Sequence, residues 1–347
     1  HKMLRITKGK NSVTFWDIQP FFGMSLDAAA QRYLSERKIE METKRFTKEY
    51  VQKNFNKIVK YCIQDAVLTE KLGKFLLRKL REFGIRTNNL YSPASVAFMY
   101  FKKHTKIVDV WRYWCYYKDL LRFACEAYKG GKFEVVGRGA FEGYEYDINS
   151  AYPYEIANLI DITDALVVRS NKYVDKAEYG FLYCKIDTQK LLYSPVPLRV
   201  GEVNIYPLGQ IVTYITKDEY DYLIRNGAKV DIKDGWWLIP RTRRKPYRKL
   251  IEKMHKLKEY YRNKDDMLYN LVKLMMNSFY GKMVQLVKSP DGKLIAGAGW
   301  NPIYAATITA RVRVKITEIQ RRLHLDCLAV HTDSVITKKP IPREYLG

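Results

Sequence analysis

The stretch KLMMNSFYGK, residues 273–282, begins with a lysine and ends with a tyrosine–glycine pair. Its apolar residues recur at helical spacing, so we expect a helix here. Two other stretches place an aspartate at the end of an apolar run: YEYDINSAYPYE, residues 144–155, and AVHTDSVI, residues 329–336. A lysine and two aspartates from separate segments suit the transfer of a nucleotidyl group, because the carboxylates hold divalent ions and the cation neutralises departing phosphates.

The charge balance favours a polyanionic partner. The 347 residues include 61 Lys and Arg against 37 Asp and Glu, a formal net charge of +24 that is spread along the chain. Such an excess favours nucleic acid first and an anionic membrane surface second. The 28 tyrosines add aromatic faces that suit stacking on bases. The alternative, a protein that its lysines merely solvate, rarely needs so large an excess.

Cysteine usage and hydropathy indicate the compartment. The five cysteines form no C-x-x-C pair, so we expect neither a zinc knuckle nor a disulfide framework. Such cysteine usage favours a reducing compartment. No apolar run approaches the roughly 18 residues of a spanning helix. The start, HKMLRITKGK, lacks the apolar core of a signal peptide. We therefore expect an intracellular, cytoplasmic protein with no membrane partner.

Apolar periodicity predicts a mixed helix and strand protein with two or three domains. The expected helices are a segment that Ser25 caps, a long segment that ends at Gly84, most of 86–126, the short DEYDYLIRNG, a hairpin over 243–282 broken near 263–266, and 301–323 with Pro302 in its first turn. The expected strands are NSVTFWDI, segments within 130–146, a β-rich stretch over 155–240, and a strand–turn–strand over CLAVHTDSVIT.

The three opening stretches resemble motifs A, B and C of family B DNA polymerases, in that order. DINSAYP is similar to D-x-x-S-L-Y-P, KLMMNSFYG matches K-x-x-x-N-S-x-Y-G, and HTDS resembles D-T-D-S. YKGG, residues 128–131, resembles the Y-x-G-G motif that precedes motif A, especially in protein-primed phage and plasmid members. YCIQD, residues 61–65, is similar to the Y-x-x-x-D motif of the proofreading exonuclease. One such motif arises readily by chance, whereas five in the family's order do not.

This resemblance implies an α/β (α+β) fold, a right-hand polymerase palm and fingers with a truncated RNase H-like exonuclease portion. The implied segments are 1–85, the C-terminal part of an exonuclease-like domain; 86–126, a helical linker; 127–242, the first part of the palm with an insertion; 243–284, the fingers hairpin; and 285–347, the second part of the palm.

The implied function is that of a DNA-directed DNA polymerase core with two Mg²⁺ or Mn²⁺ ions. Primer–template DNA and dNTPs would be its partners, with a terminal protein or other replication factors in addition. The non-enzymatic alternative is a catalytically weak polymerase-like fold that binds primer–template DNA as a scaffold.

The resemblance also assigns roles to single residues. Asp147 would bind both ions with the help of the Ile148 carbonyl, and Asp333 would be the second carboxylate. Tyr152 would lie under the sugar of the incoming nucleotide and exclude a 2′-hydroxyl. The remaining nucleotide contacts would come from Asn149, Ser150, Arg262 (with Lys258 as an alternative), Lys273, Asn277 and Tyr280. The DNA contacts would come from Tyr128, Lys129, Gly130, Gly131 and Gly281, the last of which has a helix C-cap as its structural alternative.

The sequence departs from the family pattern at motif C. His331 stands where the family usually has the first aspartate, and in a strand it would share a face with Asp333. We expect His331 to modulate a chemically viable site, and the alternative is an inactivated polymerase.

The match to the exonuclease is limited to Tyr61 and Asp65. The first two exonuclease motifs would precede residue 1, Asp17 and Asp27 are expected to be structural, and exonuclease activity is not expected. The chain ends before the region that would form the thumb, so we expect an internal portion of a larger polymerase, with a naturally reduced relative as the alternative.

Overall fold

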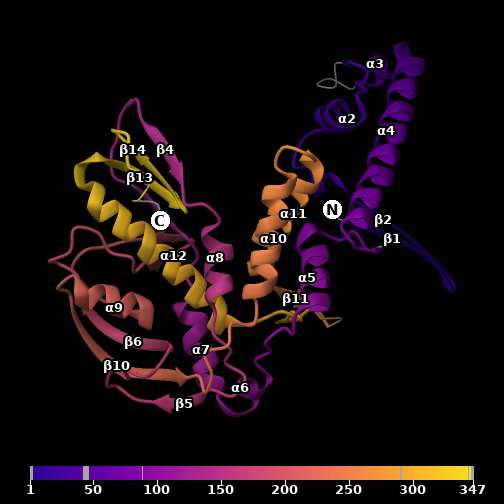
Figure 1. The fold of residues 1–347 in the computed structure, drawn as a ribbon. Helices are drawn as coiled ribbons and strands as arrows, with labels where there is room; N and C mark the ends of the chain where they lie inside the picture. The colour runs from indigo at the N-terminus through magenta and orange to yellow at the C-terminus, as the bar shows by residue number, and fades with distance from the viewer. Residues whose placement is uncertain (1–2, 42–46, 88, 290, 343, 345–347) are drawn as a thin grey trace. The chain divides into compact units, whose positions relative to one another are not determined.

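The computed structural model describes residues 3–41, 47–87, 89–289, 291–342 and 344, and it divides into two compact units (Figure 1). The first unit comprises residues 1–103 and 254–278, and the second comprises residues 104–253 and 279–347. Each unit therefore joins two stretches that lie far apart in the sequence.

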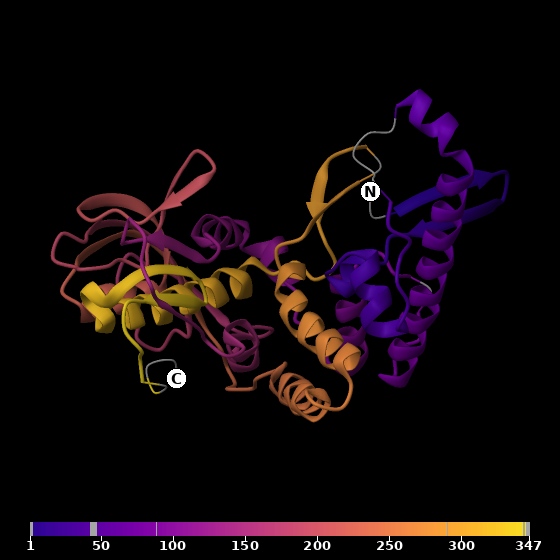
Figure 2. The ribbon, with the colours of Figure 1, turned by 90° about the horizontal axis from the view of Figure 1, so that it is seen from above.

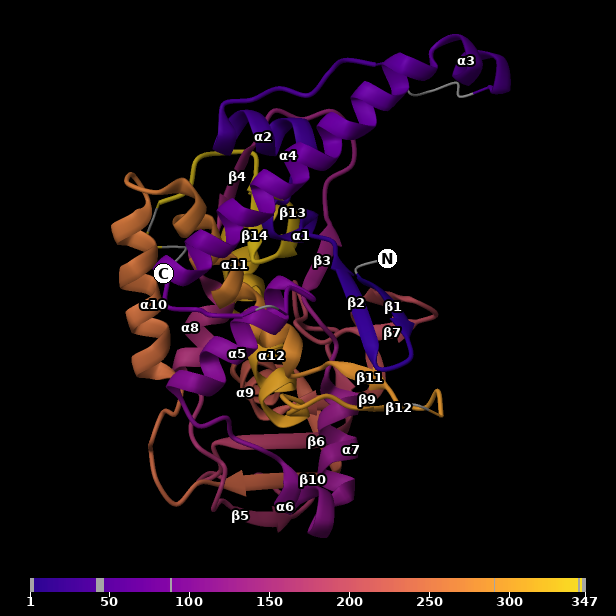
Figure 3. The same ribbon diagram turned by 90° about the vertical axis from the view of Figure 1, so that its right-hand side faces the viewer.

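The first unit is mainly helical. Its elements are the hairpin of β1 (Met3–Lys8) and β2 (Asn11–Trp16), then α1 (Gln19–Phe22), α2 (Leu26–Leu34), α3 (Lys48–Lys53), α4 (Phe55–Glu82) and most of α5 (Pro93–His104). On α4, leucines recur every four residues at 68, 72, 76 and 80, and all four are buried. This spacing makes one apolar stripe, against which the Ser25-capped helix α2 packs (Figure 3).

The predicted hairpin consists of α10 (Arg248–Tyr261) and α11 (Asp266–Lys282), and its turn belongs to the first unit. The start of α11 is tied to the other helices of that unit by ion pairs. Lys79 on α4 lies 2.7 Å from Asp265, and Arg32 on α2 lies 2.7 Å from Asp266. Both helices continue into the second unit, so each crosses from one unit to the other without a break.

The second unit contains a four-stranded antiparallel sheet that carries the motif residues. Its strand order is β3 (Lys132–Val135), β13 (Cys327–Thr332), β14 (Ser334–Thr337) and β4 (Tyr144–Asp147). Helix α12 (Pro302–Leu323) covers one face (Figure 2). Its Val312 and Ile316 belong to one buried apolar cluster with Val330 and Val335 of the sheet. The other face of the sheet is left open for side chains such as Phe133 and His331, which are exposed.

A second four-stranded antiparallel sheet is built from the segment between motifs A and B. Its order is β5 (Leu166–Arg169), β10 (Lys229–Ile239), β6 (Tyr179–Asp187) and β9 (Gln210–Thr216). The other elements of the unit are α6 (Trp111–Tyr116), α7 (Lys118–Ala127), α8 (Ala151–Asn158), β7 (Leu198–Val200), β8 (Val203–Ile205), α9 (Lys217–Arg225), β11 (Leu286–Lys288), β12 (Leu294–Ala296) and the short 3-10 turn η1 (His324–Asp326). Helices α7, α9 and α12 all pack against this sheet.

A polar stripe runs along the buried side of α12 and joins these parts. Arg313 is fully buried, and its Nη2 lies 2.7 Å from Oε1 of Glu219 on α9. Its Nη1 donates to the Gly130 carbonyl at 2.5 Å. One and two turns further along, Thr317 and Gln320 accept hydrogen bonds from the buried Lys132 Nζ on β3, at 3.4 and 2.8 Å. Residues four and three apart share a helix face, so one face of α12 holds three separate elements.

Most predicted elements are confirmed, including the mixed helix and strand class and the hairpin broken near 263–266. The prediction of a β-rich stretch from residue 155 is wrong at its start, because α8 extends to Asn158. Pro153 and Ile156 face the interior three residues apart, which is helical spacing, and Pro153 sits in the first turn where its missing N–H costs nothing. The C-cap alternative for Gly281 is also wrong, since α11 ends at Lys282.

Among the described residues, none of the helices combines the length and apolar character that a membrane crossing requires.

The buried ion pair predicts an unequal response to two arginine substitutions. Arg313→Leu leaves the Glu219 carboxylate buried without its partner, which we expect to lower the free energy of unfolding by about 3–5 kcal/mol. Arg225→Ala removes a pair with Glu318 in which the arginine is largely exposed, and it should cost less than about 1 kcal/mol. Urea unfolding of both variants measures the difference, and similar losses would contradict this account of Arg313.

Candidate active site

The two predicted catalytic aspartates meet at neighbouring strand ends. Asp147 is the last residue of β4 and is paired in register with Ser334 on β14. Asp333 lies in the tight turn between β13 and β14, after Thr332, whose φ is 61°. The backbone joins the two segments directly, since Ile148 N donates to the Asp333 carbonyl at 2.8 Å. Motifs A and C therefore present their carboxylates together at one end of the sheet.

The electrostatics of this pair favour a bound cation. Burial and the negative charge of Asp147 raise the pKa of Asp333, while His331 acts in the opposite direction. Two neighbouring carboxylates repel each other, and a divalent ion would relieve that repulsion. Oxygen donors of this kind suit Mg²⁺ or Mn²⁺, which retain water and bind substrate phosphates. No third His, Cys, Asp or Glu side chain completes a metal cluster in the part of the chain that the structure describes. The aspartate pair thus suits metal ions whose remaining ligands come from water and a bound substrate.

His331 lies on the open face of the sheet. The alternation argument for His331 and Asp333 does not apply, because Asp333 lies in the turn. The register pairs His331 with Ser334 and Ser334 with Asp147, so His331 shares a face with Asp147 instead. Its ring meets the Phe133 ring edge to face, with centroids 4.4 Å apart.

Three predicted tyrosines from separate motifs form one cluster. The Tyr280 hydroxyl donates to the Tyr128 hydroxyl at 2.6 Å, and the rings of Tyr152 and Tyr280 are 5.2 Å apart between centroids. Burial raises the pKa of Tyr280, and burial together with the nearby Asp333 charge raises the pKa of Tyr152. The hydroxyls of Tyr152 and Tyr280 therefore stay protonated, and these two rings offer neutral, rigid surfaces beside the aspartates.

Each residue of the loop at 128–131 accepts a hydrogen bond from another part of the second unit. Beyond the Tyr128 hydroxyl, the carbonyl of Lys129 accepts from Asn204 at 2.6 Å and that of Gly131 accepts from the Tyr206 hydroxyl at 3.2 Å. The Gly130 carbonyl accepts from Arg313, as described above. Sequence reasoning missed these three partners, because they carry no motif and lie 75 to 183 positions away.

Both glycines of this loop have a reason within the protein. Gly130 has a φ of 75°, in the left-handed region. A Cβ on Gly131 would lie 2.8 Å from Cγ2 and 3.3 Å from Cα of Thr332. Gly131 therefore permits the loop to pack directly on the turn that carries Asp333.

Motif A continues into α8 through a strained residue. Ser150 has a φ of 56°, its hydroxyl lies 3.1 Å from Asn149 Oδ1, and its carbonyl accepts from Tyr154 N at 2.9 Å. Beside this turn lies a cavity of about 330 Å³, lined by Ile148, Asn149, Ala151, Tyr154, Glu155, Val312 and Lys315. Burial raises the pKa of Glu155 to about 7, against the opposing effect of Arg311.

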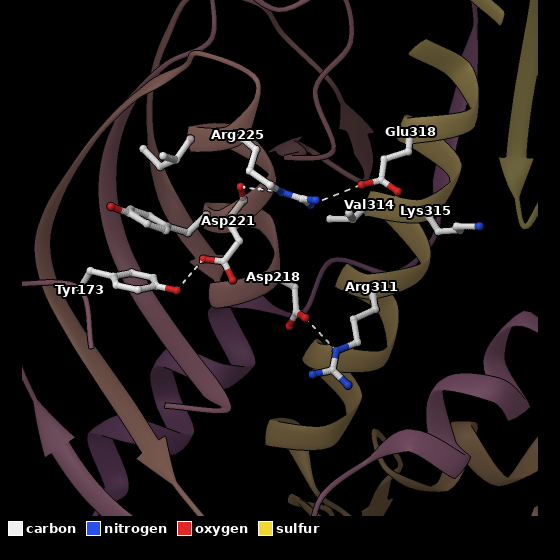
Figure 4. Close-up of a pocket in the computed structure, with 10 residues that line it drawn as sticks. Tyr173, Asp218, Asp221, Arg225, Arg311, Val314, Lys315 and Glu318 are labelled. Atoms are coloured by element: carbon white, nitrogen blue, oxygen red, sulfur yellow. Dashed lines mark hydrogen bonds and ion pairs between the residues drawn. The ribbon is translucent and has the colours of Figure 1, made fainter. Parts of the chain in front are cut away.

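A cavity of about 690 Å³ lies between α9 and α12, and neither Asp147 nor Asp333 lines it (Figure 4). Its charged groups mostly neutralise one another. Arg311 Nε is 2.8 Å from Asp218, and Arg225 is 3.3 Å from Glu318. The Tyr173 hydroxyl donates to Asp221 at 3.0 Å. These contacts hold the segment between motifs A and B onto α12 and identify no reactive group.

The other predicted nucleotide contacts lie on the hairpin. Lys273 and Asn277 are exposed and one turn apart on α11. Arg262 pairs with Glu259 at 2.9 Å. Lys258 is buried, and its pKa is lowered first by burial, with the charge of Lys273 contributing. The charge of Arg262 lowers the pKa of Lys258 in the same way. Lys258 and Arg262 therefore both stay candidate partners of Lys273.

Gly281 differs from the loop glycines. A Cβ built on it would meet no heavy atom within 4 Å. Among the described residues, therefore, no contact explains a glycine at this place.

The exonuclease-like residues form a lysine-neutralised group in the first unit. Asp65 lies 2.7 Å from Lys38, whose Nζ lies 4.3 Å from the Tyr61 ring centroid. Within the described residues, Asp65 Oδ1 is buried and has no hydrogen-bond partner. Asp17 accepts from Gln19 N and Asp27 from Lys38 N, which agrees with structural roles for these two.

The family comparison covers most of the chain. Residues 13–295 match the family described as DNA polymerase type B, organellar and viral. The chain is 24% identical to a DNA polymerase of Acidianus bottle-shaped virus (isolate Italy/Pozzuoli), over 100% of this chain and 57% of that protein. It is 26% identical to a probable DNA polymerase of Ascobolus immersus, over 69% of this chain and 21% of that protein. The chain thus spans little more than half of the viral relative.

The fold is similar to that of phi29 DNA polymerase. The orthorhombic crystal form of that enzyme aligns with a TM-score of 0.69 and 16% identity, over 99% of this chain and 64% of the other. Its ternary complex with primer-template DNA and incoming nucleotide substrates aligns with a TM-score of 0.66 and 16% identity, over 99% and 65%.

The repulsion at the aspartate pair predicts a pH-dependent gain in stability. The pKa of Asp333 is higher in the folded protein than in the unfolded chain. The ionised carboxylate of Asp333 therefore destabilises the folded state at neutral pH, and this effect disappears in acid, where Asp333 is protonated in both states. We expect Asp333→Asn to increase the free energy of unfolding by about 0.5–1 kcal/mol at neutral pH, and by less in acid. Asp326→Asn, which removes a partner of Lys339 3.2 Å away, is the control and should bring no gain. An equal gain at both pH values would contradict the assignment.

Proposed function

Because the chain belongs to the organellar and viral family of type B DNA polymerases, we propose that it is a DNA-directed DNA polymerase core. It adds a dNTP to the 3′-hydroxyl of a primer as a template strand directs. The observation that carries the proposal is the meeting of Asp147 and Asp333 beside the cluster of Tyr128, Tyr152 and Tyr280.

The aspartate pair holds two Mg²⁺ or Mn²⁺ ions in this proposal. When bound, such ions activate the attacking hydroxyl and stabilise charge on the phosphates. Asp147 and Asp333 bind them, with the Ile148 carbonyl as a further oxygen donor. His331, on the face of Asp147, modulates the site.

The incoming nucleotide is contacted by residues of motifs A and B in this proposal. The exposed Lys273, with Arg262 or Lys258, neutralises the triphosphate, and Asn149 and Ser150 approach it from the turn of motif A. Tyr152 packs under the sugar. Asn277, Tyr280 and Gly281 form the floor under the templating pair. Open space next to Gly281, within the described part of the chain, supports a role in contact with the base pair.

Template DNA is bound by the loop of Tyr128, Lys129, Gly130 and Gly131, whose fastening keeps it rigid beside the aspartates. The solved phi29 complexes contain primer-template DNA, which supports the same partner here. We assign 127–242 and 285–347 to the palm, 243–284 to the fingers, 1–85 to the exonuclease-like part and 86–126 to the linker. A terminal protein or other replication factors complete the proposed partners, and the reaction takes place inside the cell.

Extension of a labelled primer–template by one nucleotide tests the proposal. We expect template-directed addition by the 347-residue chain with Mg²⁺ or Mn²⁺. Asp147→Asn and Asp333→Asn should each lower it by at least about a hundredfold, because each removes a metal ligand. Asp326→Asn, outside the site, should retain it.

DNA binding without addition under either metal would contradict the polymerase proposal and favour the scaffold. Addition that survives both aspartate substitutions would instead show that the metal ligands are wrongly assigned.

The Tyr152 assignment makes a separate prediction about sugar selection. Tyr152→Ala should raise the relative efficiency of ribonucleotide addition by at least about tenfold, because the ring no longer excludes the 2′-hydroxyl. Tyr152→Phe keeps the ring and should keep the discrimination. Competition between a dNTP and its ribonucleotide measures the ratio, and an unchanged ratio in the alanine variant would remove Tyr152 from this role.

A further inference from the structure

Helix α6 of the second unit exposes most of its aromatic side chains. The segment WRYWCYY, residues 111–117, forms one short helix and the residue after it. Trp111, Trp114 and Tyr116 are 70%, 50% and 78% exposed. Tyr113, on the opposite side, is buried, and its hydroxyl donates to the Ile162 carbonyl. One buried tyrosine therefore anchors the helix, and the larger rings face outward.

Three large exposed aromatic rings within six residues are unusual for a surface that has no ligand. Contiguous exposed apolar surface marks interaction sites in soluble proteins, whereas scattered single residues do not. The Trp114 ring also meets the Trp300 ring edge to face, with centroids 6.4 Å apart, which extends the aromatic surface to a second segment.

The surroundings of α6 are basic. Arg112 donates through Nη1 to the carbonyls of Thr163 and Ala165 at 3.3 Å, so α6 rests on the loop at residues 161–165. The same loop pairs with the exposed basic run RTRRK, residues 241–245, through Asp161 and Arg244, 2.7 Å apart.

Two of the four nearby acids are already neutralised. Asp161 pairs with Arg244, and Asp119 pairs with Arg122. Asp109 accepts the backbone N–H of Trp111, and Asp164 is the remaining nearby carboxylate. Lys118 and Arg241 have no ion-pair partner among the residues that the structure describes. With Arg112, which contacts only backbone carbonyls, these cations outnumber the unpaired Asp109 and Asp164 by one positive charge.

Within the second unit, α6 lies far from the aspartates. Figures 1 and 3 both place α6 beside β5, at the end of the unit opposite to the strands β4, β13 and β14. The proposed reaction at Asp147 and Asp333 does not use this surface.

We propose that Trp111, Trp114 and Tyr116, with Arg112, Lys118 and Arg241, form a binding surface for single-stranded DNA. Unpaired bases stack on the exposed rings, and the cations neutralise the phosphates between them. Aromatic faces accept every base, so the surface binds without sequence preference. A protein partner fits less well, because a rim of unpaired cations favours a polyanion. The inference goes beyond the proposed polymerase reaction.

Binding of a fluorescent oligothymidylate, followed by anisotropy, tests the surface. Trp111→Ala with Tyr116→Ala should weaken binding by at least about tenfold, as stacking contributes for each base. Phe55→Ala, which removes an equally exposed ring in the first unit, is the matched control and should bind as the parent does. Because the two substituted rings are exposed, thermal unfolding should stay unchanged.

A second pair of variants tests the electrostatic part. Lys118→Gln with Arg241→Gln should flatten the dependence of the logarithm of affinity on that of salt, since fewer counterions are released. The double aromatic variant should keep the parent's slope.

Asp333→Asn, which should not extend a primer, should bind the oligonucleotide like the parent, so failure of the polymerase proposal is distinguishable from failure here. Unchanged affinity in the double aromatic variant would overturn the proposal. If sedimentation also showed that this variant loses a self-association of the parent, α6 would be a contact between copies of the chain.

Discussion

The buried guanidinium of Arg313 is the interaction on which the candidate site depends. It joins Glu219, which also caps α9, to the carbonyl of Gly130 in the loop before β3. A charge buried this deeply is tolerated only when its partners are in place, so α12, α9 and the loop must assemble together. Lys132, two residues further on, repeats the arrangement by donating to Gln320 on the same face of α12. The strands next to Asp147 and Asp333 therefore rest on a helix whose buried face is partly polar.

This arrangement explains why the aspartates are held by contacts that lie outside their own motifs. Gly131 packs on Thr332, and Thr332 precedes Asp333 in the turn. A displacement of α12 would move the loop at residues 128–131 through the Gly130 carbonyl, and it would move the turn that carries Asp333 through Gly131. Motif A would move as well, because Ile148 N donates a hydrogen bond to the Asp333 carbonyl. The side chains that would do the chemistry are exposed or half-buried, whereas Arg313, Glu219 and Lys132, which support them, are buried.

The sequence predicts the site better than it predicts the support of the site. The order of five motifs indicates the family, and local patterns predict the capped helix after Ser25 and the helical hairpin. The beginning of the β-rich stretch is misjudged because α8 is short and contains Pro153, which reads as a turn. Asn204, Tyr206 and Arg313 escape detection because their contacts are made across 75 or more positions. The face shared by His331 and Asp147 depends on strand register, which a single sequence does not reveal.

The regular course of α11 has one more consequence. Lys273 and Asn277 are four residues apart on this helix, which sets their separation along the axis at about 6 Å. Both side chains are exposed, and residues four apart share one face of a helix. The helix therefore holds a cation and an amide at a constant spacing, and a molecule shorter than one helical turn would contact only one of them.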